Sequence, residues 1–139
     1  VLPSKHPLSS KIELLKEDLY KLNFVTLDSQ STTRKVVDKL LQDSGLDIQR
    51  LKIEMELNSL EAIKNAVQSG LGASFLPVVS IERELVAGTI QKVFVADLEV
   101  TRELKLITNP SRYSSRASEE FKNYILPKFA GLKSPLRHK

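Results

Sequence analysis

The stretch at residues 52–77, KIEMELNSLEAIKNAVQSGLGASFLP, decides the fold of this chain. Its first six residues alternate charged and apolar side chains, which predicts a strand with one solvated face. Apolar residues then recur at the spacing of one helical face until Gly70, where the helix is expected to end. Gly72 predicts a tight turn into a buried strand at residues 73–79. The stretch therefore predicts a strand, a helix and a second strand.

The residues before this stretch repeat the same order. Residues 23–28, NFVTLD, are rich in strand-forming side chains. A helix is then expected to end at Gly45, because four apolar residues at helical spacing precede it: Val36, Val37, Leu40 and Leu41. Consecutive strand–helix units form parallel sheets through right-handed crossovers. The expected fold class is therefore α/β, a small sheet with helices on both faces.

The rest of the chain predicts further elements around that sheet. In chain order we expect an extended segment at residues 1–10, a short amphipathic segment at 11–22, a short helix at 80–87 capped by Ser80, strands at 90–95 and 102–108, a last helix at 115–129 and a disordered basic tail at 130–139.

Composition excludes several classes of protein. Hydrophobic residues make up 41% and charged residues 27% of the 139 residues, which is typical of one globular domain. No apolar run approaches the roughly 20 residues that span a bilayer, so no membrane partner is expected. The absence of cysteine excludes a disulfide scaffold and a thiolate metal site. No signal peptide is visible. Because the first residue is Val1 rather than a methionine, we expect a piece of a longer protein.

The net charge of +4 leaves two interpretations of the tail open. Positive residues there have no acidic neighbour after Glu120: Lys128, Lys133, Arg137 and Lys139. Such a tail can contact nucleic acid, or it can be a solvated chain end. The rest of the chain mixes both signs of charge without a basic stripe, so the fragment is not expected to bind DNA by itself.

No catalytic constellation is found in the sequence. His6 and His138 lie near opposite ends and outside any motif. The glycines at residues 70–72 follow a helix instead of opening one, so we interpret them as a turn rather than a phosphate-binding loop. Glu54 and Glu56 lie about 6.5–7 Å apart by strand rise, a spacing open to acid–base chemistry, but the alternating pattern explains them as a solvated strand face. We therefore expect no enzyme activity, no metal site and no cofactor.

Both predicted parallel strands end in small polar residues that open a helix. The candidate binding residues are Ser29, Gln30, Ser31, Thr32, Thr33 and Arg34 after the first strand, and Asn58 and Ser59 after the second. Ligands of open α/β sheets bind outside the carboxyl ends of the strands, where helix N-termini offer N–H groups and partial positive charge to anions. Ordinary capping needs only one such residue per helix. We interpret these junctions as a site for a small anion or polyol, with Arg34 either adding charge or pointing to solvent.

At residues 5–129 the chain resembles the effector-binding domain of LysR-type transcriptional regulators. The similarity rests on short phrases in family order: HPL at 6–8, AV at 66–67, GLG at 70–72, LP at 76–77, EL at 84–85 and Gly88. Longer phrases are similar to the cyanobacterial and plastid branch that controls RuBisCO and inorganic-carbon genes: DSQSTTRKVVD at 28–38, EMELNSLEAIKNAVQSGLGA at 54–73 and NPSRYSSRA at 109–117.

This resemblance implies a periplasmic-binding-protein-like (type 2) effector domain, with the second subdomain complete and the first mostly missing. Residues 1–100 would form the second subdomain with its leading segment, residues 101–109 a hinge strand, and residues 110–129 the C-terminal helix of the first subdomain. The candidate binding residues would then form one wall of the cleft between the subdomains.

The resemblance also implies ligands, partners and location. The effector candidates are small anions: 2-phosphoglycolate, 2-oxoglutarate, ribulose 1,5-bisphosphate and NADP. DNA would be bound only through an N-terminal winged helix-turn-helix domain outside this chain, by a homodimer or homotetramer in the cytoplasm or the plastid stroma. Two alternatives stay open, a solute-binding protein of the same fold and an enzyme of the same broad fold, the second disfavoured by the missing catalytic residues.

Overall fold

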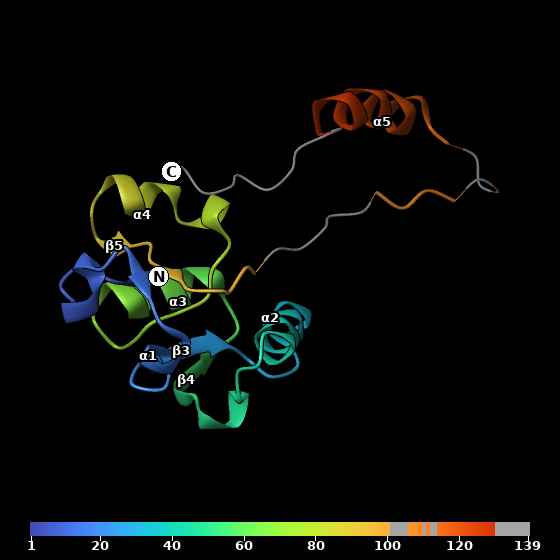
Figure 1. The fold of residues 1–139 in the computed structure, drawn as a ribbon. Coiled ribbons are helices and arrows are strands. Elements are labelled where there is room, and N and C mark those ends of the chain that lie inside the picture. The colour runs from blue at the N-terminus through green and yellow to red at the C-terminus, as the bar shows by residue number, and fades with distance from the viewer. Residues whose placement is uncertain (101–105, 110, 112–113, 130–139) are drawn as a thin grey trace. The chain divides into compact units, whose positions relative to one another are not determined.

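The computed structural model describes residues 1–100, 106–109, 111 and 114–129. The chain divides into two compact units, Val1–Val100 and Thr101–Lys139. Figure 1 shows short strands with helices around them in the first unit, and the helix α5 in the second.

Two parallel strands, β3 (Asn23–Leu27) and β4 (Lys52–Leu57), organise the first unit. Helix α2 (Thr32–Asp43) follows β3, and helix α3 (Leu60–Gln68) follows β4. The predicted order of strand, helix, strand and helix is therefore confirmed. The two strands end in register, because Leu27 pairs with Leu57, and both following loops consequently start at the same edge.

Backbone hydrogen bonds extend this pair into a wider layer. The amide of Ala73 donates to the carbonyl of Asn23 at 2.7 Å, while the next amide, that of Ser74, donates to the carbonyl of Val1 at 3.1 Å. Strand β1 (Leu2–Pro3) continues from Val1 and pairs antiparallel with β5 (Ile90–Gln91). The layer therefore runs from β4 through β3, residues 73–74 and β1 to β5.

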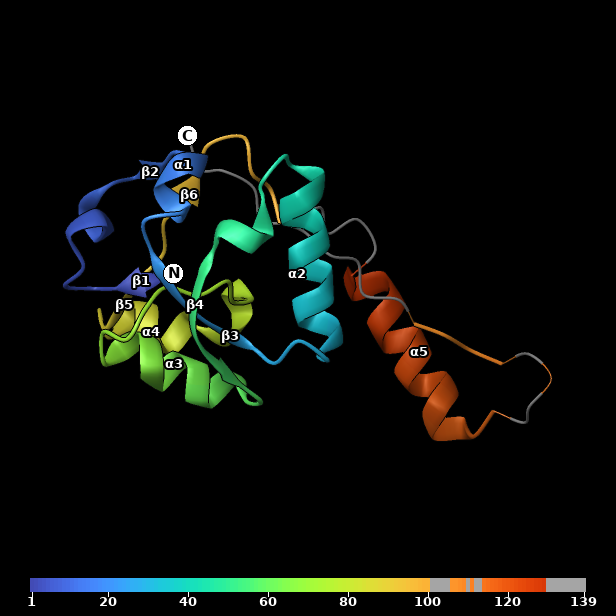
Figure 2. The same cartoon turned by 90° about the horizontal axis from the view of Figure 1, so that it is seen from below.

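Helices cover both faces of this layer, as the sequence predicted. Phe24 is buried in a cluster with Leu41 of α2, whereas the next residue, Val25, is buried with Ile63 and Val67 of α3. Successive side chains of a strand point to opposite faces, so α2 and α3 lie on opposite sides, which Figure 2 shows from below. Each such buried side chain stabilises the fold by about 1.5–3 kcal/mol through removal from water.

Shorter elements complete the first unit. Strands β2 (Glu13–Leu14) and β6 (Phe94–Val95) pair in parallel. The short helices are α1 (Lys16–Leu19) and α4 (Glu82–Val86), and single 3-10 turns lie at Pro7–Ser10, Ile48–Arg50 and Val78–Ser80. The leading segment expected to be extended thus contains β1 and a 3-10 turn, and residues 11–22 combine β2 with α1.

The prediction of a strand at residues 73–79 is wrong beyond its first two residues. Ala73 and Ser74 make the hydrogen bonds of the layer, and Ala73 bridges Phe24 in parallel. Pro77 has no amide to donate to a neighbouring strand, and the chain continues as the 3-10 turn Val78–Ser80. An apolar run indicated burial here, but it did not indicate how far the pairing extends.

Two neighbouring predictions also need correction. The strand expected at residues 90–95 is two strands, β5 and β6, which pair with different partners. Ser80 does not cap the following helix, because its hydroxyl donates to the carbonyl of Pro77 at 2.7 Å and α4 begins two residues later.

The expected alternation along β4 is interrupted. Phe24 pairs with Ile53 while the adjacent Val25 pairs with Met55, so Glu54 is an extra residue in the ladder. An extra residue of this kind turns the following side chain. Met55 is accordingly 41% exposed, although the pattern placed it on the apolar face.

The second unit contains helix α5 (Arg116–Phe129), one residue shorter than predicted. Four of its large apolar side chains are exposed: Phe121, Tyr124, Leu126 and Phe129. Of the strand predicted at residues 102–108, the described residues 106–108 have no regular structure, and residues 102–105 lie outside the described residues. The predicted tail at 130–139 also lies outside them. None of the described helices has the length and apolar character that crossing a membrane requires.

Candidate functional site

The first candidate junction is a tight polar turn between β3 and α2. The Asp28 carboxylate accepts a hydrogen bond from the amide of Gln30 at 3.0 Å, and the Asp28 carbonyl accepts one from the amide of Ser31 at 3.0 Å. Asp28 therefore shapes the turn, and Ser29 and Gln30 lie exposed at its tip. Such a side-chain-to-backbone bond is the usual role of aspartate at a turn.

The second junction lies directly beside the first. The amide of Asp28 donates to the carbonyl of Leu57 at 3.0 Å, which joins the ends of the two strands. Asn58 and Ser59 follow Leu57; Asn58 is exposed and Ser59 is half-buried. The structure thus brings both groups of candidate residues together at the carboxyl edge of β3 and β4, and we call residues 28–34 with Asn58 and Ser59 the polar edge.

The helices that open at the polar edge have no hydroxyl cap. Ser31 and Ser59 occupy the N-cap positions of α2 and α3, as expected, but neither side chain makes a capping hydrogen bond. The first turn of α2 also contains no acidic residue, whereas that of α3 contains Glu61. The N-terminal amides and partial positive charge of α2 are therefore the less compensated of the two.

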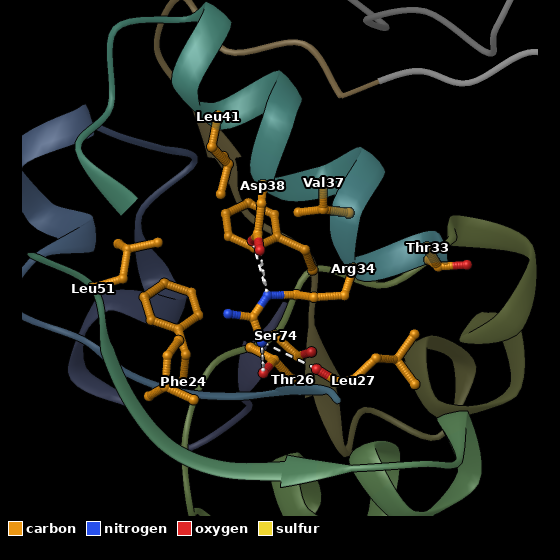
Figure 3. Close-up of a pocket in the computed structure, with 12 residues that line it drawn as sticks. Phe24, Thr26, Leu27, Thr33, Arg34, Val37, Asp38, Leu41, Leu51 and Ser74 are labelled. Carbon is orange, nitrogen blue, oxygen red and sulfur yellow. Dashed lines mark hydrogen bonds and ion pairs between the residues drawn. The ribbon is translucent and has the colours of Figure 1, made fainter. Parts of the chain in front are cut away.

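Arg34 does not point to the tip of the turn or to solvent. Its Nε donates to both oxygens of Asp38 at 2.8 Å, and its Nη1 donates to the Leu27 carbonyl at 3.0 Å and to Glu56 Oε1 at 3.1 Å. The same nitrogen donates to the hydroxyl of Thr26. Figure 3 shows the side chain running beneath α2 toward the end of β3. Its side chain is only 15% exposed.

A small pocket lies beside this arginine, between α2 and the layer. Its volume is about 30 Å³. Its lining residues are Phe24, Thr26, Leu27, Thr33, Arg34, Val37, Asp38, Leu41, Leu51, Ile53, Ser74 and Phe75. The rings of Phe24 and Phe75 stack with their centroids 5.6 Å apart, which makes part of the wall apolar. A space of this size has room for a water molecule but not for a metabolite.

Sequence reasoning missed four residues that shape this region. Thr26, Asp28, Asp38 and Glu56 fix the turn or the arginine, but none was among the candidate binding residues. One of these contacts could have been inferred from the sequence, because Arg34 and Asp38 have the i, i+4 spacing of a helical ion pair. The contacts with Thr26 and Glu56 depend on the pairing of two strands, which the sequence does not specify to the residue.

The residues considered for catalysis are engaged otherwise. The ring of His6 accepts a hydrogen bond from the amide of Leu8 at 3.1 Å, and Glu56 pairs with Arg34. His138 lies outside the described residues. Within the described ranges, no group of three or more histidine, aspartate or glutamate side chains could hold a metal ion.

An ion pair with altered proton affinity connects α3 to α4. Lys64, whose side chain is 8% exposed, lies 2.8 Å from Glu61 and 2.9 Å from Glu84. The hydrogen bonds that Lys64 donates to Glu61 and then to Glu84 raise the pKa of Lys64, and the one that Glu84 accepts from Lys64 lowers the pKa of Glu84. The second carboxylate oxygen of Glu84 is buried and has no hydrogen-bond partner among the described residues. This pair belongs to the packing of the helices, not to the polar edge.

Comparison with known proteins shows which family and which regulators this chain is similar to. The profile of the family described as LysR substrate binding domain matches residues 1–130. A probable RuBisCO transcriptional regulator of Synechocystis sp. is 53% identical over 130 residues, which is 94% of this chain and 38% of that protein. The protein of the same description from Porphyra purpurea is 50% identical over 139 residues, all of this chain and 43% of that protein. The chain thus spans about two fifths of the length of these curated relatives.

Two solved structures share the fold. The regulatory domain of Synechocystis CcmR, in complex with 2-PG, superposes with a TM-score of 0.76 at 22% identity over 96% of this chain and 62% of that one. The effector-binding domain of QuiR, in complex with shikimate, gives a TM-score of 0.67 at 20% identity over 91% of this chain and 58% of that one. At these identities the superpositions establish the fold, which is the type 2 periplasmic-binding-protein-like class predicted from the sequence.

Proposed function

Because this chain belongs to the LysR substrate binding domain family, we propose that it is the effector-sensing part of a transcriptional regulator of carbon-fixation and inorganic-carbon genes. The relatives at about half identity are described as RuBisCO transcriptional regulators, which supports regulation rather than catalysis. The polar edge would bind a small anionic metabolite, and the protein would act on DNA through a separate winged helix-turn-helix domain.

The observation that carries the binding proposal is the meeting of two polar junctions at one sheet edge. The Asp28 amide donates to the Leu57 carbonyl at 3.0 Å, so two loops that carry hydroxyl, amide and backbone N–H donors start side by side. Oxygen atoms of carboxylates and phosphates are suited to such donors and to the positive end of α2. We propose Ser29, Gln30, Ser31, Thr32, Thr33, Asn58 and Ser59 as the effector contacts, with Arg34 at the base of the site.

The effector candidates are anions with two charged groups or a phosphate. The structural neighbour CcmR holds 2-PG and QuiR holds shikimate, both bearing a carboxylate, so 2-phosphoglycolate is the first candidate for this chain. The other candidates are 2-oxoglutarate, ribulose 1,5-bisphosphate and NADP.

The site proposed here is one wall of a cleft. We propose that residues 1–100 form the second effector subdomain, that residues 101–109 are the hinge strand, and that residues 110–129 supply a helix to the first subdomain. An anion that contacts both walls would favour one angle between the subdomains. In a homodimer or homotetramer in the cytoplasm or plastid stroma, that change would alter the affinity for DNA.

Calorimetry on the full-length protein tests the site. Ser31→Ala combined with Thr32→Ala removes two hydroxyls from the polar edge, and we expect affinity for 2-phosphoglycolate to fall at least about tenfold, because a hydrogen bond to a charged group contributes about 1.5–3 kcal/mol. Thr89→Ala is the matched control, since Thr89 is exposed and lies on another loop. Unchanged affinity in the double variant would reject the site.

The same preparation separates a regulator from a solute-binding protein of this fold. A regulator changes its affinity for operator DNA when 2-phosphoglycolate is added, because binding at one site is coupled to binding at the other. A solute-binding protein takes up the anion and has no DNA affinity to change. An anion that binds without any effect on DNA binding would therefore favour the second function.

A further inference from the structure

We infer that Arg34 is a positioning residue: it fixes the geometry of the polar edge by tying three elements together, and it does not supply the positive charge that the anion meets. The consequence for binding rests on the proposed function. The structural part, that Arg34 holds the turn in place, does not depend on it.

The contacts of Arg34 bracket the turn at residues 28–31. On one side lie Thr26 and Leu27, the last residues of β3, and on the other lies Asp38, in the second turn of α2. Glu56 adds the end of β4 at 3.1 Å. A planar guanidinium can serve several acceptors at fixed angles, which a lysine ammonium on a flexible stem cannot do. One side chain therefore sets how the strand ends and the start of α2 lie relative to one another.

The charges around Arg34 argue against direct contact with an anion. Two carboxylates, Asp38 and Glu56, surround one guanidinium at 2.8 and 3.1 Å, so the positive charge is already compensated. A direct contact would require the guanidinium to leave these partners. Attraction of an anion can instead come from the positive end of α2, whose N-cap side chain makes no capping hydrogen bond and whose first turn contains no acidic residue.

These two roles predict opposite effects of removing the Asp38 carboxylate. If Arg34 positions the turn, Asp38→Ala loosens it and the affinity for the anion falls. If Arg34 binds the anion directly, Asp38→Ala frees a positive charge and the affinity rises. Arg34→Lys makes the same distinction, because it keeps the charge but loses the planar set of donors.

The first measurement needs no ligand. In the full-length protein, Arg34→Lys and Arg34→Met are expected to speed hydrogen exchange about tenfold at the amides that hold the turn, those of Asp28, Ser31 and Lys35, while α3 exchanges as before. Lys39→Met is the control, since Lys39 is exposed on the same helix. Exchange that stays at the wild-type rate in both Arg34 variants would overturn the inference.

The second measurement is calorimetry with 2-phosphoglycolate. We expect Arg34→Lys, Arg34→Met and Asp38→Ala each to weaken binding, the first two by similar factors of about ten. Tighter binding in Asp38→Ala, or near-normal binding in Arg34→Lys with loss only in Arg34→Met, would show a direct contact and overturn the inference. If the wild-type protein binds none of the anions, the proposed function fails, and the exchange measurement still decides whether Arg34 positions the turn.

Discussion

At the scale of single residues, Gly72 is required by the close approach of two backbones. A Cβ at this position would lie 2.6 Å from the carbonyl oxygen of Asn23, which belongs to β3. The adjacent amide of Ala73 donates to that same oxygen at 2.7 Å, so the two segments cannot separate without losing a hydrogen bond of the layer. The glycine therefore allows residues 73–74 to join β3.

Gly72→Ala is expected to lower the free energy of unfolding by about 1–3 kcal/mol, the usual cost of forcing extra atoms into a packed site. Urea denaturation measures it, with Leu71→Ala as the control, because Leu71 is 51% exposed and its truncation removes little buried area. Equal stabilities of the two variants would mean that the backbone approach is looser than described.

Residues whose partners are close in sequence could be predicted better than those whose partners are distant. The pairing of Arg34 with Asp38 follows from helical spacing, and Gly45 and Gly70 end their helices with positive φ values of 83° and 90°, as expected. The contacts of Arg34 with Thr26 and Glu56 could not be foreseen, because they arise only once β3 and β4 pair in their observed register.

At the scale of elements, Lys64 and Glu84 join α3 to α4. Lys64 is almost completely buried. Its removal would leave the Glu84 carboxylate without its partner, and one oxygen of that carboxylate already has no hydrogen-bond partner within the described structure. A buried charge that loses its partner is destabilising. The connection between the helices should therefore depend on the protonation of this pair.

Lys64→Met is expected to lower the thermal midpoint at pH 7 more than Glu61→Gln, because Glu61 is 77% exposed and well solvated. The pKa of Glu84 is lowered on folding, so the ion pair stabilises the protein above the ordinary glutamate value of 4.5 and loses this effect as pH falls through the lowered pKa. The difference between wild type and Lys64→Met should shrink in that acidic range. A difference that is constant from pH 7 to pH 3 would contradict this role.

Helices and strands were predicted correctly where a repeating pattern of apolar side chains extended over enough residues to be recognised. The bounds of β4 match the sequence pattern, whereas the strands expected at residues 73–79 and 90–95 are shorter or divided. Short apolar runs indicate that a segment is buried, but they contain no repeating pattern that marks where a strand begins and ends. The observed strand pairing depends on Pro77 and on which distant segments supply the partner strands.

At the scale of the whole molecule, the two halves of the proposed site come from separate strand–helix pairs, β3 with α2 and β4 with α3. Each strand–helix pair alone offers one helix N-terminus and a short polar segment, which is ordinary for an α/β protein. Parallel pairing of β3 with β4 places the two side by side, and the layer order keeps both at one edge. The sequence indicated this edge through its polar residues, whereas no residue pattern in it distinguishes one small anion from another.

Hydrogen exchange of the full-length protein with and without 2-phosphoglycolate tests the central claim most directly. The first-turn amides of Thr32 and Arg34 in α2, and those at residues 60–62 in α3, have no hydrogen-bond acceptor within their own helices and should exchange rapidly without ligand. We expect 2-phosphoglycolate to slow exchange most strongly at the α2 amides and to slow it at the α3 amides as well. Binding that protects other segments and leaves both helix starts unchanged would contradict it.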